Sequence, residues 1–223
     1  MDQAVAVNIQ EEDDYLLYPA HLPNTAVDVT VVVPTFNGFA TLARAVDSVR
    51  RQSLLELEII VVDDASTDRS WAYLQEIARA DSRVRVLRHK VNAGKPIGMN
   101  RATALARGRW LAVLDADDWY HPNRLARLVA LGERHGVDMT SDNQFFFDGI
   151  ANKVVGTAWP AGSGEWRLSF DRFLAGSDAY ETFNLGMLKP VLRTNFIRRT
   201  ELLYEAGARH GQDFFYMVRF FCT

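Results

Sequence analysis

The sequence predicts a doubly wound α/β domain, built on a mostly parallel sheet that is flanked by helices. Short apolar runs rich in β-branched residues alternate along the chain with stretches whose apolar residues repeat at helical spacing. This alternation is typical of parallel βαβ units. The composition agrees, because 48% of the 223 residues are hydrophobic, which suffices for one large domain with its own core.

Four apolar runs are interpreted as the strands of this sheet. Residues 29–33 are mostly valine and end at Pro34, which is typical of a strand buried on both faces. The other three strands are expected at residues 57–62, 84–87 and 110–114.

A helix is expected after each of these strands. Asp68 is the expected N-cap of the second helix, and Pro122 is expected to open the fourth at its first turn. The third covers residues 97–107 and is stopped by Gly108. The residues expected to face inward are Leu42, Val46 and Val49, then Trp71, Leu74 and Ile77, and finally Leu125, Leu128, Val129 and Leu131.

The chain divides into three parts. Residues 1–27 form an acidic leader, expected to be a solvated tail or a strap across the domain without chemistry of its own. Residues 28–136 form the regular half, and residues 137–223 continue the same domain less regularly. In this last part we expect two strands joined by a turn at Asp148-Gly149, and then three helices; the strands lie at 137–147 and 153–159, and the helices at 169–175, at 195–206 and from Gly211. The sequence ends inside the last helix, so we expect a truncated chain.

Charge and composition exclude several classes of function. The formal net charge of -3 gives no general attraction to nucleic acid or to anionic lipid. Cys222 is the only cysteine, which excludes an intrachain disulfide and argues against a cysteine zinc site. Neither a signal peptide nor an apolar run of about 18 residues is present. We expect a cytoplasmic protein, and peripheral contact with the inner face of the membrane stays open.

Three carboxylates follow directly after the run 110–114, in the segment Asp115-Ala116-Asp117-Asp118. Carboxylates so close together repel one another, and burying them is costly unless a cation or hydrogen-bond donors compensate. Oxygen-rich clusters of this kind suit Mg²⁺ or Mn²⁺, usually shared with substrate phosphates. Capping of the next helix is the alternative, but one aspartate would serve for that. We therefore expect a divalent-metal site for a nucleotide diphosphate.

Polar residues also follow the second strand, and in such sheets ligands bind beyond the carboxyl ends of the strands. Asp63 and Asp64 could bind a pyrimidine base or ribose hydroxyls, and ordinary turn chemistry explains them equally well. Lys95, which follows Gly94, could offset diphosphate charge or be a solvated lysine at a helix start. No P-loop spacing surrounds it, and no G-x-G-x-x-G follows the first strand, which weighs against a dinucleotide enzyme.

Asp213 is the one acid in a strongly aromatic stretch near the end of the chain. A carboxylate in an apolar, partly desolvated pocket has a raised pKa and can act as a general base. The alternative is an acid favoured by the dipole of a helix start. The five histidines show no zinc-binding pattern.

Taken together, four segments resemble the family 2 glycosyltransferases of GT-A fold, in order and spacing over about residues 28–135. They are Thr30-Val31-Val32-Val33-Pro34-Thr35-Phe36-Asn37, Ile59-Ile60-Val61-Val62-Asp63-Asp64-Ala65-Ser66-Thr67-Asp68, Asn92-Ala93-Gly94 and Leu114-Asp115-Ala116-Asp117-Asp118. Farther on, Gly211-Gln212-Asp213 is similar to the family's acid motif, in which glutamate more often stands at the position of Gln212. The family also often has Ala-Arg-Asn where this chain has Gly98-Met99-Asn100, so one diphosphate or base contact would have to come from Lys95 or Arg101.

The resemblance implies that residues 28–136 bind a nucleotide sugar and that residues 137–223 face the acceptor. Asp64 would hydrogen-bond uracil, with Asp63 supporting its loop. Asp117 would ligate Mn²⁺ or Mg²⁺, with Asp115 contacting the metal or the ribose, and Asp213 would be the catalytic base. The other residues expected at the nucleotide-sugar site are Pro34, Thr35, Phe36, Gly94, Lys95, Asn100 and Ala116.

The activity that the resemblance implies is a metal-dependent, inverting transfer from a UDP-sugar, with UDP-glucose as one candidate. The acceptor would be a hydroxyl of a glycan or a lipid-linked oligosaccharide in bacterial exopolysaccharide or surface-glycan synthesis.

Two other functions stay open. A sugar-phosphate nucleotidyltransferase would also use a metal and an α/β sheet, but usually carries a glycine-rich basic loop where this chain has Thr35-Phe36-Asn37-Gly38-Phe39. A nucleotide-binding module without transfer activity would explain the early end at Thr223.

Overall fold

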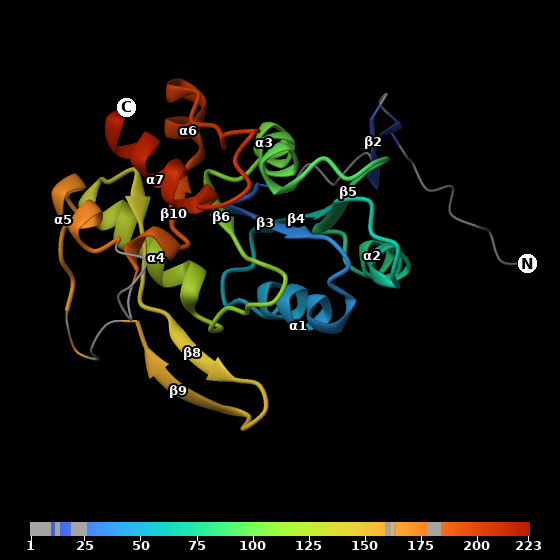
Figure 1. The fold of residues 1–223 in the computed structure, drawn as a ribbon, viewed down its shortest axis with the longest axis horizontal. Helices are drawn as coiled ribbons and strands as arrows, with labels where there is room; N and C mark the ends of the chain where they lie inside the picture. The colour runs from blue at the N-terminus through green and yellow to red at the C-terminus, as the bar shows by residue number, and fades with distance from the viewer. Residues whose placement is uncertain (1–9, 12–13, 19–25, 159–161, 163, 178–183) are drawn as a thin grey trace, which may run out of the picture.

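The protein, seen in a computed structural model, is built around a sheet of eight strands in the order β1-β2-β5-β4-β3-β6-β10-β7. The structure describes residues 10–11, 14–18, 26–158, 162, 164–177 and 184–223. Four strands at the centre are parallel: β3 (Val29–Thr35), β4 (Leu57–Asp63), β5 (Val84–His89) and β6 (Trp110–Val113). This is the predicted α/β architecture (Figure 1).

Helices cover both faces of the sheet (Figure 1). The helices α1 (Phe39–Arg50), α2 (Ser70–Ala80) and α4 (Arg124–His135) pack on one face, and α3 (Lys95–Leu105), α6 (Thr194–Thr200) and α7 (Gln212–Cys222) on the other. Because successive side chains of a strand point to opposite faces, Val31 belongs to the first core and Val32 to the second. Both strand faces are therefore apolar, as the valine run predicts.

The chain reverses its direction of travel across the sheet at β3. It adds β4 and β5 on one side of β3, and then returns through α3 to place β6 on the other side. Such a topological switch point leaves a crevice beyond the carboxyl ends of the two strands, because the following loops diverge to opposite sides. Thr35 ends β3 and Asp115 lies just beyond β6, so both border this crevice.

Short antiparallel strands extend the sheet at both edges. β2 (Tyr15–Tyr18) pairs with β5 and with β1 (Gln10–Glu11), and β10 (Val191–Arg193) lies between β6 and β7 (Met139–Thr140). Leu17 and Tyr18 are buried, so this part of the leader is a strap on the domain rather than a solvated tail. Neither β2 nor β10 was expected from the sequence, because strands of three or four residues carry too little periodicity.

A hairpin of β8 (Phe145–Asp148) and β9 (Lys153–Thr157) projects from the body of the molecule (Figure 1). The expected turn at Asp148-Gly149 is confirmed, but the expected strand 137–147 is two separate strands, β7 and β8. Residue 159, the expected end of the second strand, lies outside the described residues. The remaining elements are α5 (Phe170–Ala175) and the short η1 helix (Leu185–Met187).

Several expected helix boundaries are wrong. α3 begins at Lys95 and ends at Leu105, three residues before Gly108, so that glycine does not cap it. Pro122 precedes α4, whose N-cap is Asn123, and α6 ends at Thr200. Helix ends depend on local hydrogen bonds and tertiary packing, which apolar spacing does not report. Within the described part of the chain, none of the helices combines the length and apolarity needed to cross a bilayer.

Candidate nucleotide-sugar site

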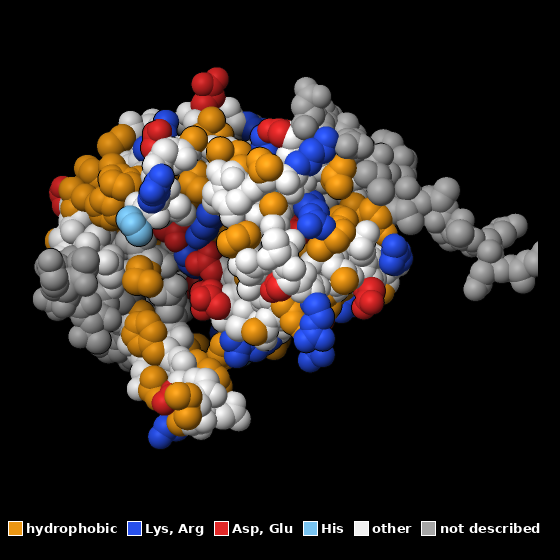
Figure 2. Space-filling view, turned by 45° about the vertical axis from the view of Figure 1, so that its right-hand side comes forward, with side chains coloured by type: hydrophobic (Ala, Val, Ile, Leu, Met, Phe, Trp, Pro, Cys, Tyr) orange, Lys and Arg blue, Asp and Glu red, His pale blue; other side chains and the backbone are white. Residues whose placement is uncertain are grey.

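A cleft of about 370 Å³ opens at the switch point between β3 and β6. Acidic and basic side chains meet in this hollow on the face shown in Figure 2. Nine residues expected at the site line it: Pro34, Thr35, Phe36, Asp64, Gly94, Lys95, Asp115, Ala116 and Asp117. These residues lie at the carboxyl ends of β3, β4 and β6 and at the start of α3, and the fold brings them to one place.

Asp64 holds the loop that leads into α3. Its Oδ1 atom accepts hydrogen bonds from the main-chain N–H of Ala93 at 2.7 Å and lies 2.7 Å from Nδ1 of His89. Its Oδ2 atom accepts the N–H of Gly94 at 2.8 Å, where Gly94 has a φ of +87° that favours glycine. Asp64 is nearly buried but reaches the cleft. It therefore shapes the rim of the cleft while keeping lone pairs on Oδ2 for a ligand.

The loops after β3 and β4 are tied to each other by Asn37. The Asn37 Oδ1 atom accepts hydrogen bonds from the N–H groups of Thr67 and Asp68, and its own N–H donates to Oγ of Ser66. Asn37 has a φ of +52°, which asparagine tolerates better than most residues. The loop that carries Phe36 is therefore fixed against the loop that carries Asp64.

Asp68 does not form the N-cap expected of it. The N-cap of α2 is Arg69, and the Asp68 side chain accepts from the N–H of Ser70 at 2.9 Å. Its other oxygen accepts the N–H of Phe39, the first residue of α1, at 3.1 Å. One carboxylate thus serves the starts of two helices, and these bonds lower its pKa against the effect of burial. The hydrogen bonds at these two helix starts therefore account for Asp68 without a ligand.

Two residues expected at the nucleotide-sugar site lie elsewhere. Asp63 is fully buried, accepts the N–H of Ser66 and lies 3.4 Å from Arg88, so it supports the loop without lining the cleft. Asn100 uses its side-chain amide on the main chain of Tyr204, donating to its carbonyl and accepting from its N–H. Asn100 is thus not among the residues that line the cleft, and its role at the nucleotide-sugar site stays a prediction.

Of the two residues expected to substitute for the family's arginine, Lys95 lines the cleft and Arg101 does not. Arg101 forms an ion pair with Asp14 beside β2. Met99, which stands where the family often has arginine, is completely buried in the core. Lys95 is the cation that lines the cleft.

Asp115 lies between two lysines. Its Oδ1 is 2.8 Å from Nζ of Lys95, and its Oδ2 is 2.7 Å from Nζ of Lys189. Burial alone would raise the pKa of Asp115, but the two lysines lower it to about 2. The same contacts raise the pKa of Lys189 although burial opposes this. Both oxygens of Asp115 are thus already neutralised by protein cations.

Asp117 and Asp118 lack such compensation. Both are exposed, and among the described residues neither carboxylate has a hydrogen-bond or ion-pair partner. Although part of the Asp118 side chain is open to solvent, partial desolvation of its carboxyl group, followed by repulsion from Asp117 and Asp115, raises its pKa. This excess negative charge fits a cation at the cleft. Within the described ranges no three carboxylate, histidine or cysteine side chains converge on one point.

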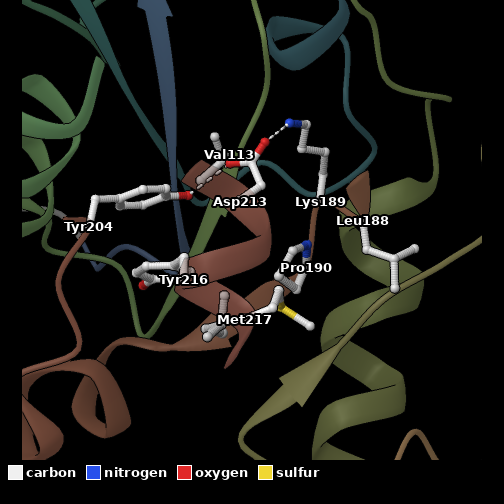
Figure 3. A pocket seen from close by; sticks show the side chains of 9 residues that line it. Val113, Leu188, Lys189, Pro190, Tyr204, Asp213, Tyr216 and Met217 are labelled. Atoms are coloured by element: carbon white, nitrogen blue, oxygen red, sulfur yellow. Dashed lines mark hydrogen bonds and ion pairs between the residues drawn. The ribbon is translucent and has the colours of Figure 1, made fainter. Parts of the chain in front are cut away.

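Asp213 lies in the first turn of α7, beside a small inner cavity of about 10 Å³ (Figure 3). Its Oδ2 forms an ion pair with Lys189 and lies 3.6 Å from Nζ of Lys95, and its Oδ1 lies 3.5 Å from the hydroxyl of Tyr204. Burial and Asp213 together raise the pKa of Tyr204 well above its usual value, so this hydroxyl remains a donor. The cavity is lined mostly by apolar side chains, as expected, but two lysines also lie beside the carboxylate.

Lys189, Tyr204 and His89 were missed by sequence reasoning. Lys189 precedes the unexpected strand β10, and Tyr204 lies in a loop, so no periodic pattern marks either residue. The Lys-Pro pair at 189–190, within an apolar stretch, is the one local signal that could have drawn attention to Lys189.

Comparisons with known proteins identify relatives of this chain in sequence and in fold. The family model described as Glycosyl transferase family 2 matches residues 30–183. The succinoglycan biosynthesis protein ExoO of Rhizobium meliloti is 32% identical over 190 residues, which are 84% of this chain and 53% of that protein. This chain thus spans about half the length of the curated relative.

Two solved structures share the fold. S. aureus TarS (residues 1–349), in complex with UDP-GlcNAc, superposes with a TM-score of 0.64 at 19% identity, covering 86% of this chain and 53% of that one. The mannosyltransferase PcManGT from Pyrobaculum calidifontis, in complex with GDP-Man and Mn²⁺, gives 0.59 at 21% identity, covering 87% and 52%. The predicted GT-A architecture is thereby confirmed.

Proposed function

The chain belongs to glycosyl transferase family 2, and on this premise we propose that it transfers a sugar from a UDP-sugar to a hydroxyl of a bacterial surface glycan or its lipid-linked precursor. The observation that carries the proposal is that Asp64, Lys95 and Asp117 line one cleft. Asp64 follows β4 and Asp117 lies beyond β6, so the fold brings them together. A base-recognising carboxylate, a metal-binding carboxylate and a cation are the groups that a nucleoside diphosphate requires. The UDP-GlcNAc bound to TarS supports the donor class, and the part of ExoO in succinoglycan biosynthesis supports the acceptor class.

In the proposed reaction, Asp213 accepts the proton of the acceptor hydroxyl, while the oxygen of that hydroxyl bonds to the anomeric carbon of the donor sugar. The bond from that carbon to the diphosphate breaks, and UDP leaves with the electron pair. A single displacement of this kind inverts the anomeric configuration. Lys95 lies near both Asp115 and Asp213, so its charge stands between the donor cleft and the proposed base.

Asp117 is the residue that we expect to hold Mn²⁺ or Mg²⁺, whose charge would stabilise the departing diphosphate. Asp115 is the weaker candidate of the two, because the lysines occupy both of its oxygens. We expect Asp115 to position Lys95 in the cleft instead.

Calorimetry of UDP binding, with Mn²⁺ and then with a chelator, tests the donor site. Binding that needs the metal and is absent for ADP supports the proposal, whereas metal-independent binding contradicts it. Transfer is tested by release of UDP from UDP-glucose and UDP-N-acetylglucosamine. Asp213→Asn should keep UDP affinity and lose about 10²- to 10⁴-fold in turnover, the usual contribution of a general base. Formation of a sugar nucleotide from UTP and a sugar phosphate would favour a nucleotidyltransferase instead.

A further inference from the structure

Lys189 links Asp115, a carboxylate of the donor cleft, to Asp213, the proposed base. Its Nζ lies 2.7 Å from Oδ2 of Asp115, which lines the donor cleft, and forms an ion pair with Oδ2 of Asp213. Figure 3 shows the Lys189 side chain directed at Asp213 from the loop before β10. Its side chain is only 13% exposed, so water screens these contacts weakly.

The main chain of Lys189 is held firmly in place. Its carbonyl oxygen accepts a hydrogen bond from Nη2 of Arg124 at 2.6 Å, and Arg124 in turn forms a two-pronged ion pair with Asp142. Directly after Pro190, the first residue of strand β10 pairs close to the carboxyl end of β6, which leads into Asp115. The main chain that bears the Lys189 side chain is therefore anchored to the sheet, and a side chain anchored in this way can orient its partners.

The partners of Asp213 divide unequally between its two oxygens. Oδ2 is bound to Lys189, with Lys95 at 3.6 Å, whereas among the residues that the structure describes Oδ1 has only the hydroxyl of Tyr204 at 3.5 Å. A carboxylate pinned through one oxygen cannot rotate freely about its Cβ–Cγ bond. Oδ1 is thus the oxygen left to accept a proton.

The cluster is also balanced in charge. Two carboxylates, Asp115 and Asp213, share two ammonium groups, Lys95 and Lys189. Without Lys189, one ammonium group would face two carboxylates, and Asp213 would be drawn toward Lys95. The base would then turn away from its present orientation and toward the donor cleft.

We propose that Lys189 is a positioning residue, which pins Oδ2 of Asp213 so that Oδ1 receives the proton of the acceptor hydroxyl. This inference rests on the proposed function, in which Asp213 is the base. Lys189 exchanges no proton in the step: the acceptor proton moves to Oδ1, the new bond forms at the anomeric carbon, and UDP leaves with the electrons of the broken bond. Loss of Lys189 should therefore lower turnover and leave donor affinity nearly unchanged.

The test compares Lys189→Met with Lys189→Arg, and uses Lys153→Met, on the exposed β9 strand, as the control. Turnover and KM are measured as UDP release from the UDP-sugar that the wild type uses best, and UDP affinity is measured by calorimetry. We expect Lys189→Met to lower kcat by about 10- to 100-fold, the effect of a displaced catalytic group, with the KM for donor within about threefold. Lys189→Arg should restore part of the loss, and Lys153→Met should match wild type.

A double mutant separates positioning from a general structural role. If Lys189 acts through Asp213, then adding Lys189→Met to Asp213→Asn should cause little further loss of kcat, because the two effects are not additive. Additive losses, or an unchanged kcat in Lys189→Met, would overturn the inference. Circular dichroism and thermal unfolding of Lys189→Met show whether the fold is kept. If it is not, the kcat of Lys189→Arg is compared with that of the double mutant Lys189→Arg with Asp213→Asn in the same way. A wild type that neither binds UDP nor releases it from a donor refutes the proposed function instead.

Discussion

The Nδ1 atom of His89 lies 2.7 Å from Oδ1 of Asp64, in a contact that the core closes off from solvent. The His89 ring is completely buried, and its Nε2 atom has no hydrogen-bond partner in the part of the chain that the structure describes. Because a carboxylate oxygen accepts, Nδ1–H of His89 donates to Asp64 and joins the N–H groups of Ala93 and Gly94 as the third donor that orients this carboxylate.

Replacing His89 should weaken the binding of UDP. In His89→Phe the volume of the ring is kept but the donor is lost, so Asp64 keeps only the N–H groups of Ala93 and Gly94. Loss of a buried hydrogen bond to a charged group costs roughly 1 to 3 kcal/mol. We expect UDP affinity to fall by about tenfold in calorimetry. His135→Phe, on the exposed end of α4, is the control and should bind UDP like wild type; equal affinity in His89→Phe would contradict a role for Asp64 at the base.

Asp117 should carry the metal dependence of UDP binding. Asp117→Asn removes the exposed carboxylate that lines the cleft, so UDP affinity in the presence of Mn²⁺ should fall at least about tenfold. With a chelator present, wild type and variant should bind UDP equally weakly. Asp118→Asn is the matched control, because that residue neighbours Asp117 without lining the cleft. An equal loss in both variants would mean that the cluster acts only through its net charge.

Gly98→Ala, which places the residue common in the family at this position, should damage this chain. A Cβ atom at Gly98 would lie 2.6 Å from Cγ1 of Val62 and 3.3 Å from Cε1 of His89. Alanine gains up to about 1 kcal/mol in helix propensity, but overpacking of a core typically costs about 1 to 3 kcal/mol. We expect a net loss of stability in thermal unfolding, together with weaker UDP binding, since Val62 lines the cleft. A stabilised variant would show that β4 and α3 can move apart freely.

Asp81 should stabilise the fold in a pH-dependent way, far from the cleft. Its pKa is held well below the usual value, first by the hydrogen bond from Arg83 and, against burial, by that from Arg50. A lowered pKa means that the stabilisation is complete above the unfolded pKa of about 4, and is lost as the pH falls below it.

Asp81→Asn should therefore lower the free energy of unfolding by roughly 1 to 3 kcal/mol at pH 7, as expected for a hydrogen-bonded charge. The difference from wild type should shrink when denaturation is repeated below about pH 4. Asp47→Asn, which breaks a more exposed pair with Arg50, should cost less than about 1 kcal/mol. A difference for Asp81→Asn that does not change with pH would refute the linkage.

The central strands and most of the cleft could be predicted from the sequence, because they depend on local information. Runs such as 29–33 are apolar at every position, and a strand buried on both faces requires this whatever its neighbours are. The clusters at Asp64 and Asp115 follow their strands directly, so the parallel topology was enough to bring them to the same edge of the sheet.

Only the tertiary structure decided which of these side chains are free to act. The sequence by itself determined the α/β order and the carboxylates at the strand ends. It contained no sign that Lys189 would reach Asp115 and Asp213, or that Asn100 would be used by Tyr204, since these partners are brought together by β10 and by loops without a periodic pattern. Ion pairs and hydrogen bonds depend on distances of a few ångström between segments far apart in the chain. Those distances arise from packing, and no local pattern encodes them.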